Sequence, residues 1–359
     1  EAILAAAGRR VGSYTSPHLW RYNERVRLDR MPADDAALCA AFARVEQARG
    51  DISLSYFEFG TLAALDLFNR ADLDVAVLEV GLGGRLDAVN VVDPDIALIT
   101  AIDLDHTDWL GPDRDSIARE KAGISRAIRP LVCADPAPPD GLLQHGLGTP
   151  RWRAGADFRI HEGRDGQWDF RSAAGDWTGL PPPALRGAHQ YRNAAGALAA
   201  LMQLPAGLRP DRAAVAQGLR AAQLPGRLDH RPGAVTQIFD VAHNPAGAQV
   251  LAAYLATLPV TGMRRTILGV LQDKDADAMI AALVPHTDLW YVPDLPGPRG
   301  GAAEWIANAI QRLAPDALIQ RFNDPANAYH TAMTDSRPGD RVVVTGSFLT
   351  VALAAPAPA

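Results

Sequence analysis

The sequence is poor in cysteine, in long apolar runs and in surplus positive charge, and each shortage excludes a class of protein. Only two cysteines, Cys39 and Cys133, occur among the 359 residues, and they form no Cys-X-X-Cys pair. This excludes a disulfide framework and a cysteine zinc site, and it fits a reducing cytosol. No apolar run approaches the roughly 18 residues that a membrane-spanning helix needs, so no membrane association is predicted.

The charge balance also argues against one kind of partner. The formal net charge is −6, whereas nucleic-acid binding requires a basic surface. Hydrophobic residues make up 48% of the chain and charged residues 21%, which is typical of a globular protein. The length accommodates two domains. Residues 1–8 read as the end of a helix that Gly8 terminates, so the sequence is interpreted as starting inside a domain.

Short apolar runs that end in Gly, Asp or Asn alternate with helical patterns. Runs that are apolar almost throughout indicate strands buried on both faces, as in parallel sheets covered by helices. The alternation of strands and helices predicts an α/β fold. The predicted strands are residues 74–80, 95–100, 237–241, 265–270, 289–292 and 341–345.

The stretch from about 130 to 185 breaks this alternation, because it is rich in Pro, Gly, Trp and charge. Weak alternation around residues 158–160 and 168–170 predicts a small antiparallel β insertion. Helices are predicted at 193–202 and 211–222. A new series of strands and helices begins after Leu224 to His230. We therefore predict a first domain at 1–226, a hinge linker at 227–232 and a second domain at 233–359.

Several polar motifs follow the predicted strands, and in open parallel sheets ligands bind at the carboxyl ends of strands. The segment from Glu79 to Asp87 contains three glycines, which allow close approach of a ligand to the backbone. A tight turn explains this motif equally well. A dinucleotide fingerprint is disfavoured, because the spacing is not Gly-X-Gly-X-X-Gly.

The segment from Thr100 to Gly111 holds three aspartates and a histidine in one short loop. A metal site and a solvated acidic loop explain it equally well; the carboxylates suit magnesium, and His106 would suggest zinc or manganese. Asp103, Asp105 and His106 could also serve a metallohydrolase, although the chain has no other His–carboxylate motif of known metal spacing.

Three further motifs have simple structural explanations when each is taken alone. The helix that Asp115 or Ser116 could cap carries Glu120 and Lys121, which an ordinary solvated helix face would explain. The segment from Tyr14 to Leu19, followed by Arg25 and Arg27, could form a turn or place the hydroxyls of Thr15 and Ser16 near a metal. The segment from Phe239 to Gly247 would place Asp240, His243 and Asn244 at a helix N-terminus, where anions are favoured.

The ordered set of these motifs resembles the folylpolyglutamate synthase and dihydrofolate synthase family of the Mur ligase superfamily. The resemblance implies a central domain of the phosphate-loop NTPase type and a smaller Rossmann-like C-terminal α/β domain. It covers essentially the whole chain, from Tyr14 to the segment at Thr345. The segments that carry it are 55–59, 79–90, 105–111, 120–124, 189–193, 224–228 and 240–245.

The resemblance also implies a metal and catalytic set. Ser16 and Glu79 match ligands of a first magnesium ion beside the ATP phosphates, and His106 matches a ligand of a second. Lys121 matches a lysine that the family carbamylates, which replaces a cation by two anionic oxygens. His243 sits where the family orients the incoming glutamate or the acyl phosphate.

The remaining implied roles concern ATP and the pterin substrate. Asn193, Arg227 and Asp240 match nucleotide-binding positions. The pterin-binding segments of the bifunctional bacterial enzymes match two further stretches of this chain. These residues are Ser55, Tyr56, Phe57 and Glu58, together with Leu86, Asp87 and Ala88.

The resemblance therefore implies a monomeric cytoplasmic ligase that uses ATP and two Mg²⁺ ions to join L-glutamate to dihydropteroate, to reduced folates or to both. The family's phosphate loop, which ends in Gly-Lys-Ser or Gly-Lys-Thr, has no match in this chain and is expected upstream of Glu1. Two alternatives remain open. One is another Mur-type ligase that acts on a cell-wall precursor, and the other is an inactive nucleotide- or folate-binding fragment.

Overall fold

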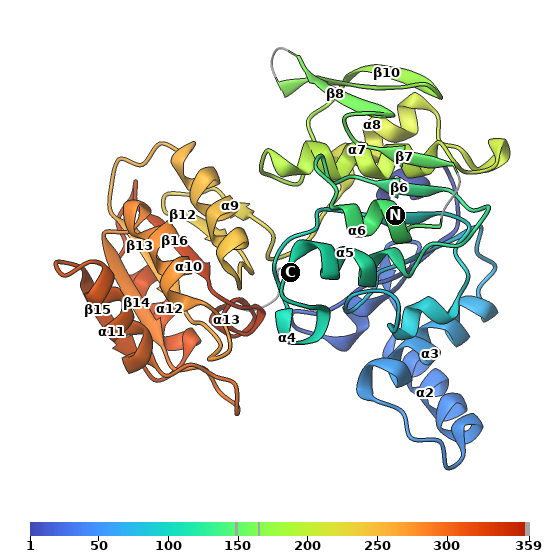
Figure 1. The fold of residues 1–359 in the computed structure, drawn as a ribbon. Coiled ribbons are helices and arrows are strands. Elements are labelled where there is room, and N and C mark those ends of the chain that lie inside the picture. The colour runs from blue at the N-terminus through green and yellow to red at the C-terminus, as the bar shows by residue number, and fades with distance from the viewer. Residues whose placement is uncertain (148–149, 164–165, 356–359) are drawn as a thin grey trace. The chain divides into compact units, whose positions relative to one another are not determined.

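The computed structural model describes residues 1–147, 150–163 and 166–355, and it shows alternating helices and strands in two compact units (Figure 1). The first unit contains residues 1–184 and 188–222. The second contains residues 185–187 and 223–359. Each unit has its own hydrophobic core.

A mixed four-stranded sheet opens the first unit, in the order β3-β2-β1-β4. Strands β1 and β4 are parallel, whereas β2 runs antiparallel to both β1 and β3. The prediction that the run at 74–80 is buried on both faces is wrong, because β4 forms an edge of this sheet and Val77 is 36% exposed. The strands are β1 (Val11–Tyr14), β2 (Val26–Leu28), β3 (Met31–Pro32) and β4 (Val75–Leu78).

The helices between these strands supply the core on this part of the unit. Helix α2 (Asp35–Arg49) packs on α3 (Tyr56–Arg70), and both contribute apolar side chains to a cluster that includes Tyr14 and Val26 of the sheet. A short helix α1 (Ala2–Ala6) and a 3-10 helix η1 (Tyr22–Arg25) flank β1.

A second sheet in the first unit is parallel throughout, in the order β5-β6-β7. Its strands are β5 (Ala97–Ile99), β6 (Leu131–Cys133) and β7 (Arg151–Arg153). The associated helices are α4 (Thr107–Leu110), α5 (Arg114–Ala122), α6 (Asp140–His145), α7 (His189–Leu201) and α8 (Arg212–Ala221). Helix α7 begins four residues before the predicted start at 193, and its Ala188 cap makes no side-chain hydrogen bond that the sequence could have signalled.

The stretch from 130 to 185 divides between two sheets. Its first part joins the parallel sheet as β6 and β7, so an antiparallel interpretation of that part is wrong. The antiparallel part begins at 158, where three strands pair in the order β10-β9-β8 and bury Trp168 and Phe170 against α7. These strands are β8 (Phe158–Glu162), β9 (Trp168–Ser172) and β10 (Gly175–Leu180).

The second unit is a six-stranded sheet in the order β11-β12-β16-β13-β14-β15, and only β11 is antiparallel to its neighbour. The strands are β11 (Asp229–Arg231), β12 (Thr236–Phe239), β13 (Arg264–Leu268), β14 (Leu289–Pro293), β15 (Leu318–Phe322) and β16 (Arg341–Thr345). Helices α9 (Pro245–Ala256), α10 (Ala276–Leu283) and α11 (Ala303–Leu313) share one core with the sheet. Helices α12 (Pro325–Thr334) and α13 (Phe348–Ala354) pack on each other and on strands.

Within the described ranges, no helix combines the length and the apolar character that crossing a bilayer requires.

Candidate active site

Ser16 and Glu79 meet because they follow neighbouring parallel strands. Tyr14 at the end of β1 pairs with Leu78 at the end of β4, so the next residues of both strands emerge at the same sheet edge. The Glu79 amide donates to the Tyr14 carbonyl at 2.9 Å. The Ser16 amide in turn donates to Glu79 Oε2 at 3.0 Å. The pair brings the exposed Glu79 carboxylate to the residue that carries the Ser16 hydroxyl, and both are oxygen donors that suit Mg²⁺.

The glycine-rich loop after β4 packs on helix α5 rather than standing open. A Cβ on Gly84 would lie 2.8 Å from the Glu120 carbonyl oxygen and 3.2 Å from the Lys121 Cα, so only glycine permits this approach. The Arg85 amide donates to the Glu120 carbonyl at 2.8 Å. Its guanidinium also pairs with the Glu120 carboxylate at 3.0 Å. The loop therefore holds the turn of α5 that carries Lys121.

Lys121 lies in an environment that disfavours its charge. The residue is half-buried, and burial lowers the pKa of its ammonium group, while the Asp105 carboxylate partly opposes that shift. A lowered pKa increases the fraction of neutral amine, which is the nucleophilic form of lysine. The cap of α5 is Asp113, which accepts the Ser116 amide at 2.7 Å, so the predicted caps Asp115 and Ser116 are wrong.

His106 adopts a backbone conformation that is uncommon for a residue with a side chain. Its φ is +52°, in the left-handed region, and it precedes helix α4. The His106 amide donates to Asp105 Oδ1 at 2.9 Å. Such conformations concentrate at functional sites. No group of three or more His, Cys, Asp and Glu side chains suited to a metal occurs among the described residues, and the predicted set draws instead on serine and lysine as well.

The predicted pterin-binding segments contain side chains of two kinds. Ser55 and Glu58 form a capping box at the start of α3, in which the Ser55 amide donates to Glu58 Oε2 at 2.6 Å and the Glu58 amide to Ser55 Oγ at 3.3 Å. Asp87 similarly accepts the amides of Leu82 and Val89, each at 2.9 Å. These three side chains shape their own loops.

The other pterin-segment side chains face outward or join the two segments. Tyr56 is 66% exposed and Leu86 is 80% exposed, so both are available to a ligand. The Phe57 ring lies against Gly81, where a Cβ would come within 2.6 Å of it. This contact brings the start of α3 to the beginning of the glycine-rich loop. Ala88 begins the 3-10 helix η2 (Ala88–Val91) that ends the loop.

Sequence reasoning assigned no role to Asn90, although it ties the glycine-rich loop to α5. Its Nδ2 donates to the carbonyls of Arg85 and Gly123, at 3.1 Å each. Arg126 donates to Asn90 Oδ1 at 3.1 Å. The sequence shows only an asparagine at the end of a glycine-rich segment. That pattern is too common to predict that its side chain connects the loop to the helix.

Asp240 and His243 follow β12 in the second unit. The buried Asp240 carboxylate accepts the amides of Leu228 at 2.8 Å and Ala242 at 2.9 Å. Burial raises its pKa, while these two hydrogen bonds and the charges of Arg227 and His243 oppose that shift. The carboxylate thus fixes Leu228, whose φ of +46° lies in the left-handed region, against the end of the strand.

His243 and Arg227 both lie beside one aromatic ring. His243 Nδ1 is 2.9 Å from the Val241 carbonyl, which accepts only, so this nitrogen carries the proton. Its ring centroid is 5.6 Å from that of Phe348. The exposed Arg227 places its guanidinium carbon 5.4 Å from the same Phe348 centroid. The second unit thereby orients two predicted ligand-binding side chains.

Asn193 stands apart from the other predicted residues of the first unit. It lies exposed on α7, and its Nδ2 donates to Gln190 Oε1 at 3.1 Å. No described contact joins it to Ser16, Glu79 or Lys121.

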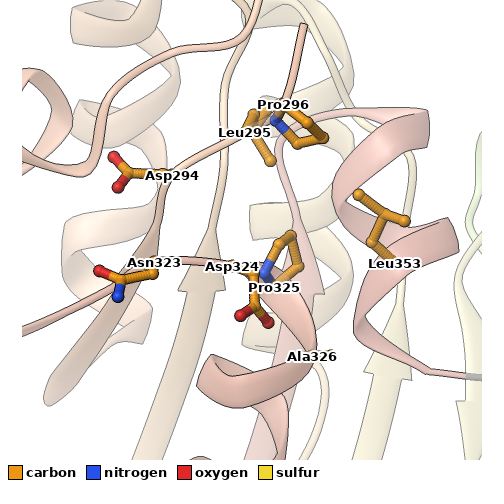
Figure 2. Close-up of a pocket in the computed structure, with 8 residues that line it drawn as sticks. All are labelled: Asp294, Leu295, Pro296, Asn323, Asp324, Pro325, Ala326 and Leu353. Carbon is orange, nitrogen blue, oxygen red and sulfur yellow. The ribbon is translucent and has the colours of Figure 1, made fainter.

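A cavity of about 250 Å³ lies at the carboxyl ends of β14 and β15 (Figure 2). Figure 2 shows Asp294 and Asn323 where these strands end, and Asp324 where α12 begins. Asp294 accepts the Ala303 amide at 2.6 Å, and Asp324 accepts the Asn327 amide at 2.8 Å. These carboxylates serve helix starts, and no predicted site residue lines the cavity.

Comparison with known proteins identifies the family. Residues 226–348 match the family model of the Mur ligase glutamate ligase domain. The chain is 45% identical to the dihydrofolate synthase/folylpolyglutamate synthase of Escherichia coli K12 over 354 residues, which is 98% of this chain and 81% of that protein. The Mycobacterium tuberculosis protein described in the same words is 33% identical, over 99% of this chain and 81% of that protein.

Solved structures agree in fold. Escherichia coli FolC in complex with DHPP and ADP superposes with a TM-score of 0.90 at 44% identity, over 98% of this chain and 82% of that one. A bifunctional folylpolyglutamate synthase/dihydrofolate synthase with Mn, AMPPNP and L-glutamate bound gives a TM-score of 0.87 at 44% identity, over 98% and 83% of the two chains. The predicted two-domain α/β fold of Mur ligases is confirmed. The chain belongs to the dihydrofolate synthase/folylpolyglutamate synthase family.

Proposed function

We propose that this protein joins L-glutamate to dihydropteroate, to reduced folates or to both, converting ATP to ADP and phosphate. One observation carries the proposal. The Ser16–Glu79 pair lies at the carboxyl edge of parallel strands, and the loop that follows Glu79 docks on the helix of Lys121. The 45% identity of the chain to a dihydrofolate synthase/folylpolyglutamate synthase supports assigning the pair to a metal and Lys121 to an ATP-dependent ligase's modified lysine.

Ser16 and Glu79 are the proposed ligands of a first Mg²⁺, and His106 is a proposed ligand of a second. The hydroxyl and carboxylate oxygens at the β1–β4 edge fit this hard cation. The left-handed backbone of His106 is a conformation that needs a reason, and presenting the imidazole to a metal supplies one. Bound Mg²⁺ would neutralise charge on the triphosphate and on the attacking carboxylate.

Lys121 is proposed to react with CO₂. Its neutral amine forms a C–N bond to carbon and loses one proton, which leaves an anionic carbamate with two oxygens that can bind a metal. Burial favours this reaction, because it lowers the pKa of Lys121 and raises the fraction of neutral amine. The chain contains only two lysines, Lys121 and Lys274. A ¹³C NMR spectrum in ¹³CO₂-saturated buffer should therefore show a carbamate signal that Lys121→Ala removes and Lys274→Ala retains.

The reaction needs an activated carboxylate, because an ionised carboxylate does not exchange oxide for an amine at neutral pH. A carboxylate oxygen of the substrate attacks the γ-phosphorus of ATP, the bond to ADP breaks, and an acyl phosphate forms. The amine of glutamate then attacks the acyl carbon, and phosphate leaves with the carboxylate oxygen. Catalysis of this kind depends mainly on positioning and electrostatic stabilisation.

The remaining proposed roles divide between substrate and nucleotide. Tyr56, Phe57 and Leu86 contact the pterin, while Ser55, Glu58, Asp87 and Ala88 shape the segments that present it. Asn193, Arg227 and Asp240 serve the nucleotide. Asp240 acts by holding the linker, since its oxygens already accept two amides. His243 orients glutamate or the acyl phosphate through Nε2, because Nδ1 is bonded to a carbonyl.

We further propose that residues 1–226 form the ATP- and pterin-binding domain, in which the antiparallel β8–β10 sheet of residues 158–180 is an insertion. Residues 233–359 form the glutamate-ligase domain, and 227–232 form the hinge. The protein acts as a cytoplasmic monomer. Two free cysteines in the described part of the chain fit a reducing compartment.

The direct test is an assay of protein expressed from the complete reading frame that encodes residues 1–359. Phosphate release should require ATP, Mg²⁺ and L-glutamate together with dihydropteroate or tetrahydrofolate, and mass spectrometry should show a product enlarged by one glutamyl unit. Phosphate release that is independent of both pterin substrates would contradict the proposal. A protein that binds dihydropteroate without turnover would support the inactive-fragment alternative.

A further inference from the structure

Arg25 is a buried cation in the first unit that no carboxylate neutralises. It ends the 3-10 helix η1 and is only 8% exposed. Among the described residues, no Asp or Glu oxygen lies within ion-pair distance of its guanidinium, whereas seventeen other Arg–carboxylate pairs occur. Burying a charge is costly unless it is paired, so the position of Arg25 requires an explanation.

The immediate neighbours of Arg25 are neutral or π-electron groups. Its Nε donates to His18 Nδ1 at 2.8 Å, which requires that nitrogen to be unprotonated. The guanidinium carbon lies 5.6 Å from the ring centroid of Tyr22 and 5.8 Å from that of Tyr56. These rings orient a cation by its attraction to their faces, but they do not neutralise it.

The adjacent carboxylate is committed elsewhere. Glu24 accepts the backbone amides of Leu19 at 2.8 Å, Trp20 at 2.8 Å and Arg21 at 2.6 Å. Three amide donors occupy this carboxylate and hold it on the backbone of residues 19–21. The charge next to Arg25 in the sequence is therefore used to shape a loop.

Two other buried arginines show how this fold usually treats such a group. Arg265 is 6% exposed and pairs with the buried Asp340 at 2.5 Å. Arg341 is 2% exposed and donates to two backbone carbonyls, those of Leu255 at 3.1 Å and His286 at 3.3 Å. Arg25 has neither a carboxylate nor a carbonyl acceptor of this kind, which distinguishes it from a purely structural arginine.

The partners of Arg25 come from the two segments nearest the proposed reaction. His18 follows Ser16 by two residues, and Tyr56 belongs to the proposed pterin-binding segment. Tyr56 is 66% exposed, so the cluster reaches solvent on the side of that segment. We infer that Arg25 binds a carboxylate of the pterin substrate, an inference that rests on the proposed function. The carboxylate would supply the missing ion-pair partner of the guanidinium beside the rings of Tyr22 and Tyr56.

The test asks whether the affinity for the ligand depends on the ligand's negative charge and on Arg25, and it measures binding without turnover. Two ligands are compared: dihydropteroate, and its analogue with the carboxylate replaced by a carboxamide of the same shape. Dissociation constants are measured by titration calorimetry without ATP. The wild-type protein should prefer the carboxylate by about tenfold to a hundredfold, the range that a charged hydrogen bond supplies. Arg25→Gln should abolish this preference while it leaves carboxamide binding nearly unchanged.

Arg27→Gln is the matched control, because Arg27 lies two residues away and already pairs with Glu1 at 2.9 Å. It should keep the preference. Arg25→Lys keeps the buried positive charge but lacks the planar guanidinium, so it should reduce the preference for the carboxylate several-fold. This variant replaces Arg25→Gln in the test if Arg25→Gln does not fold. An unchanged preference in either Arg25 variant would overturn the inference. Failure of the wild type to bind either ligand would instead count against the proposed function.

Discussion

The proposed site residues in the two units are used differently. In the second unit, the carboxylate of Asp240 accepts the backbone amides of Leu228 and Ala242. The neighbouring helix cap Asn244 likewise accepts the amide of Gly247. In the first unit, Arg25 is a buried cation without a carboxylate, and Lys121 is half-buried, which lowers the pKa of its ammonium group. The polar side chains of the second unit therefore fix the backbone at the end of β12. Among the described residues, these two charged side chains of the first unit instead lack an ion-pair partner, which a bound ligand or a covalent modification would supply.

This difference separates two kinds of substitution. A change at the second unit's edge removes internal hydrogen bonds, so its first effect is on stability. Substitution of a charged side chain that is proposed to bind a ligand leaves the fold largely intact, so its first effect is on metal or substrate binding. The variants below test that division, from the largest expected effect to the smallest.

Lys121→Ala should lower kcat by about a hundredfold or more, because it removes the proposed anionic metal ligand. Steady-state phosphate release measures the effect, and added formate or acetate should restore part of the activity by supplying carboxylate oxygens. Lys274→Ala is the matched control, since it is the only other lysine in the chain. Full activity in Lys121→Ala would refute the carbamate role.

Glu79→Gln should raise the Mg²⁺ concentration needed for half-maximal activity by roughly tenfold to a hundredfold, because a neutral amide oxygen binds the cation less strongly. Activity is titrated against Mg²⁺ at saturating ATP. The free energy of unfolding should change little, since the Glu79 side chain is exposed. A variant that loses stability without any change in Mg²⁺ dependence would place Glu79 with the structural residues.

Asp240→Asn should lower the free energy of unfolding of the second unit by about 1–3 kcal/mol, because an amide nitrogen would face one of the two buried backbone donors. Urea unfolding followed by circular dichroism measures the loss. Asp324→Asn is the control: Asp324 caps α12 from a half-buried position, and asparagine caps a helix equally well. Equal stability of the two variants would contradict the structural role of Asp240.

Ser55→Ala should lower stability by about 1 kcal/mol through loss of the α3 capping box, with little change in the KM for dihydropteroate. Asp34→Ala removes the comparable cap of α2, far from the proposed pterin segments in sequence, and sets the size of a pure capping effect. A large rise in KM for Ser55→Ala alone would show that the Ser55 hydroxyl contacts the substrate directly.

The sequence predicted the strands of the second unit well, because they are nearly continuous apolar runs. Four of its six strands, β12, β13, β14 and β16, were predicted, and they pair in parallel with one another, as such runs indicate. It missed β11, which lies within the predicted hinge linker, and β15, where Gln320 and Arg321 interrupt the apolar run on an exposed edge. It also predicted full burial for β4, since no local pattern reveals that a strand will form a sheet edge.

The sequence predicted which residues belong to the site, but not the contacts that these residues make with one another and with the backbone. The resemblance named Asp240 and Ser55, but only the folded chain shows that Asp240 holds Leu228. The Ser55–Glu58 pair could have been predicted, because Ser-X-X-Glu is the sequence signature of a capping box. Arg25 could not be singled out from its neighbours in sequence. Its significance depends on His18 and Tyr56, which tertiary structure brings to it.

The most direct test of the proposed ligase is to follow one oxygen atom. Dihydropteroate labelled with ¹⁸O in both carboxylate oxygens is incubated with ATP, Mg²⁺, L-glutamate and the protein expressed from its complete reading frame, and the released phosphate is analysed by mass spectrometry. Attack of the carboxylate on ATP predicts one ¹⁸O atom in each phosphate released. Formation of the glutamyl product with unlabelled phosphate would contradict the acyl-phosphate mechanism.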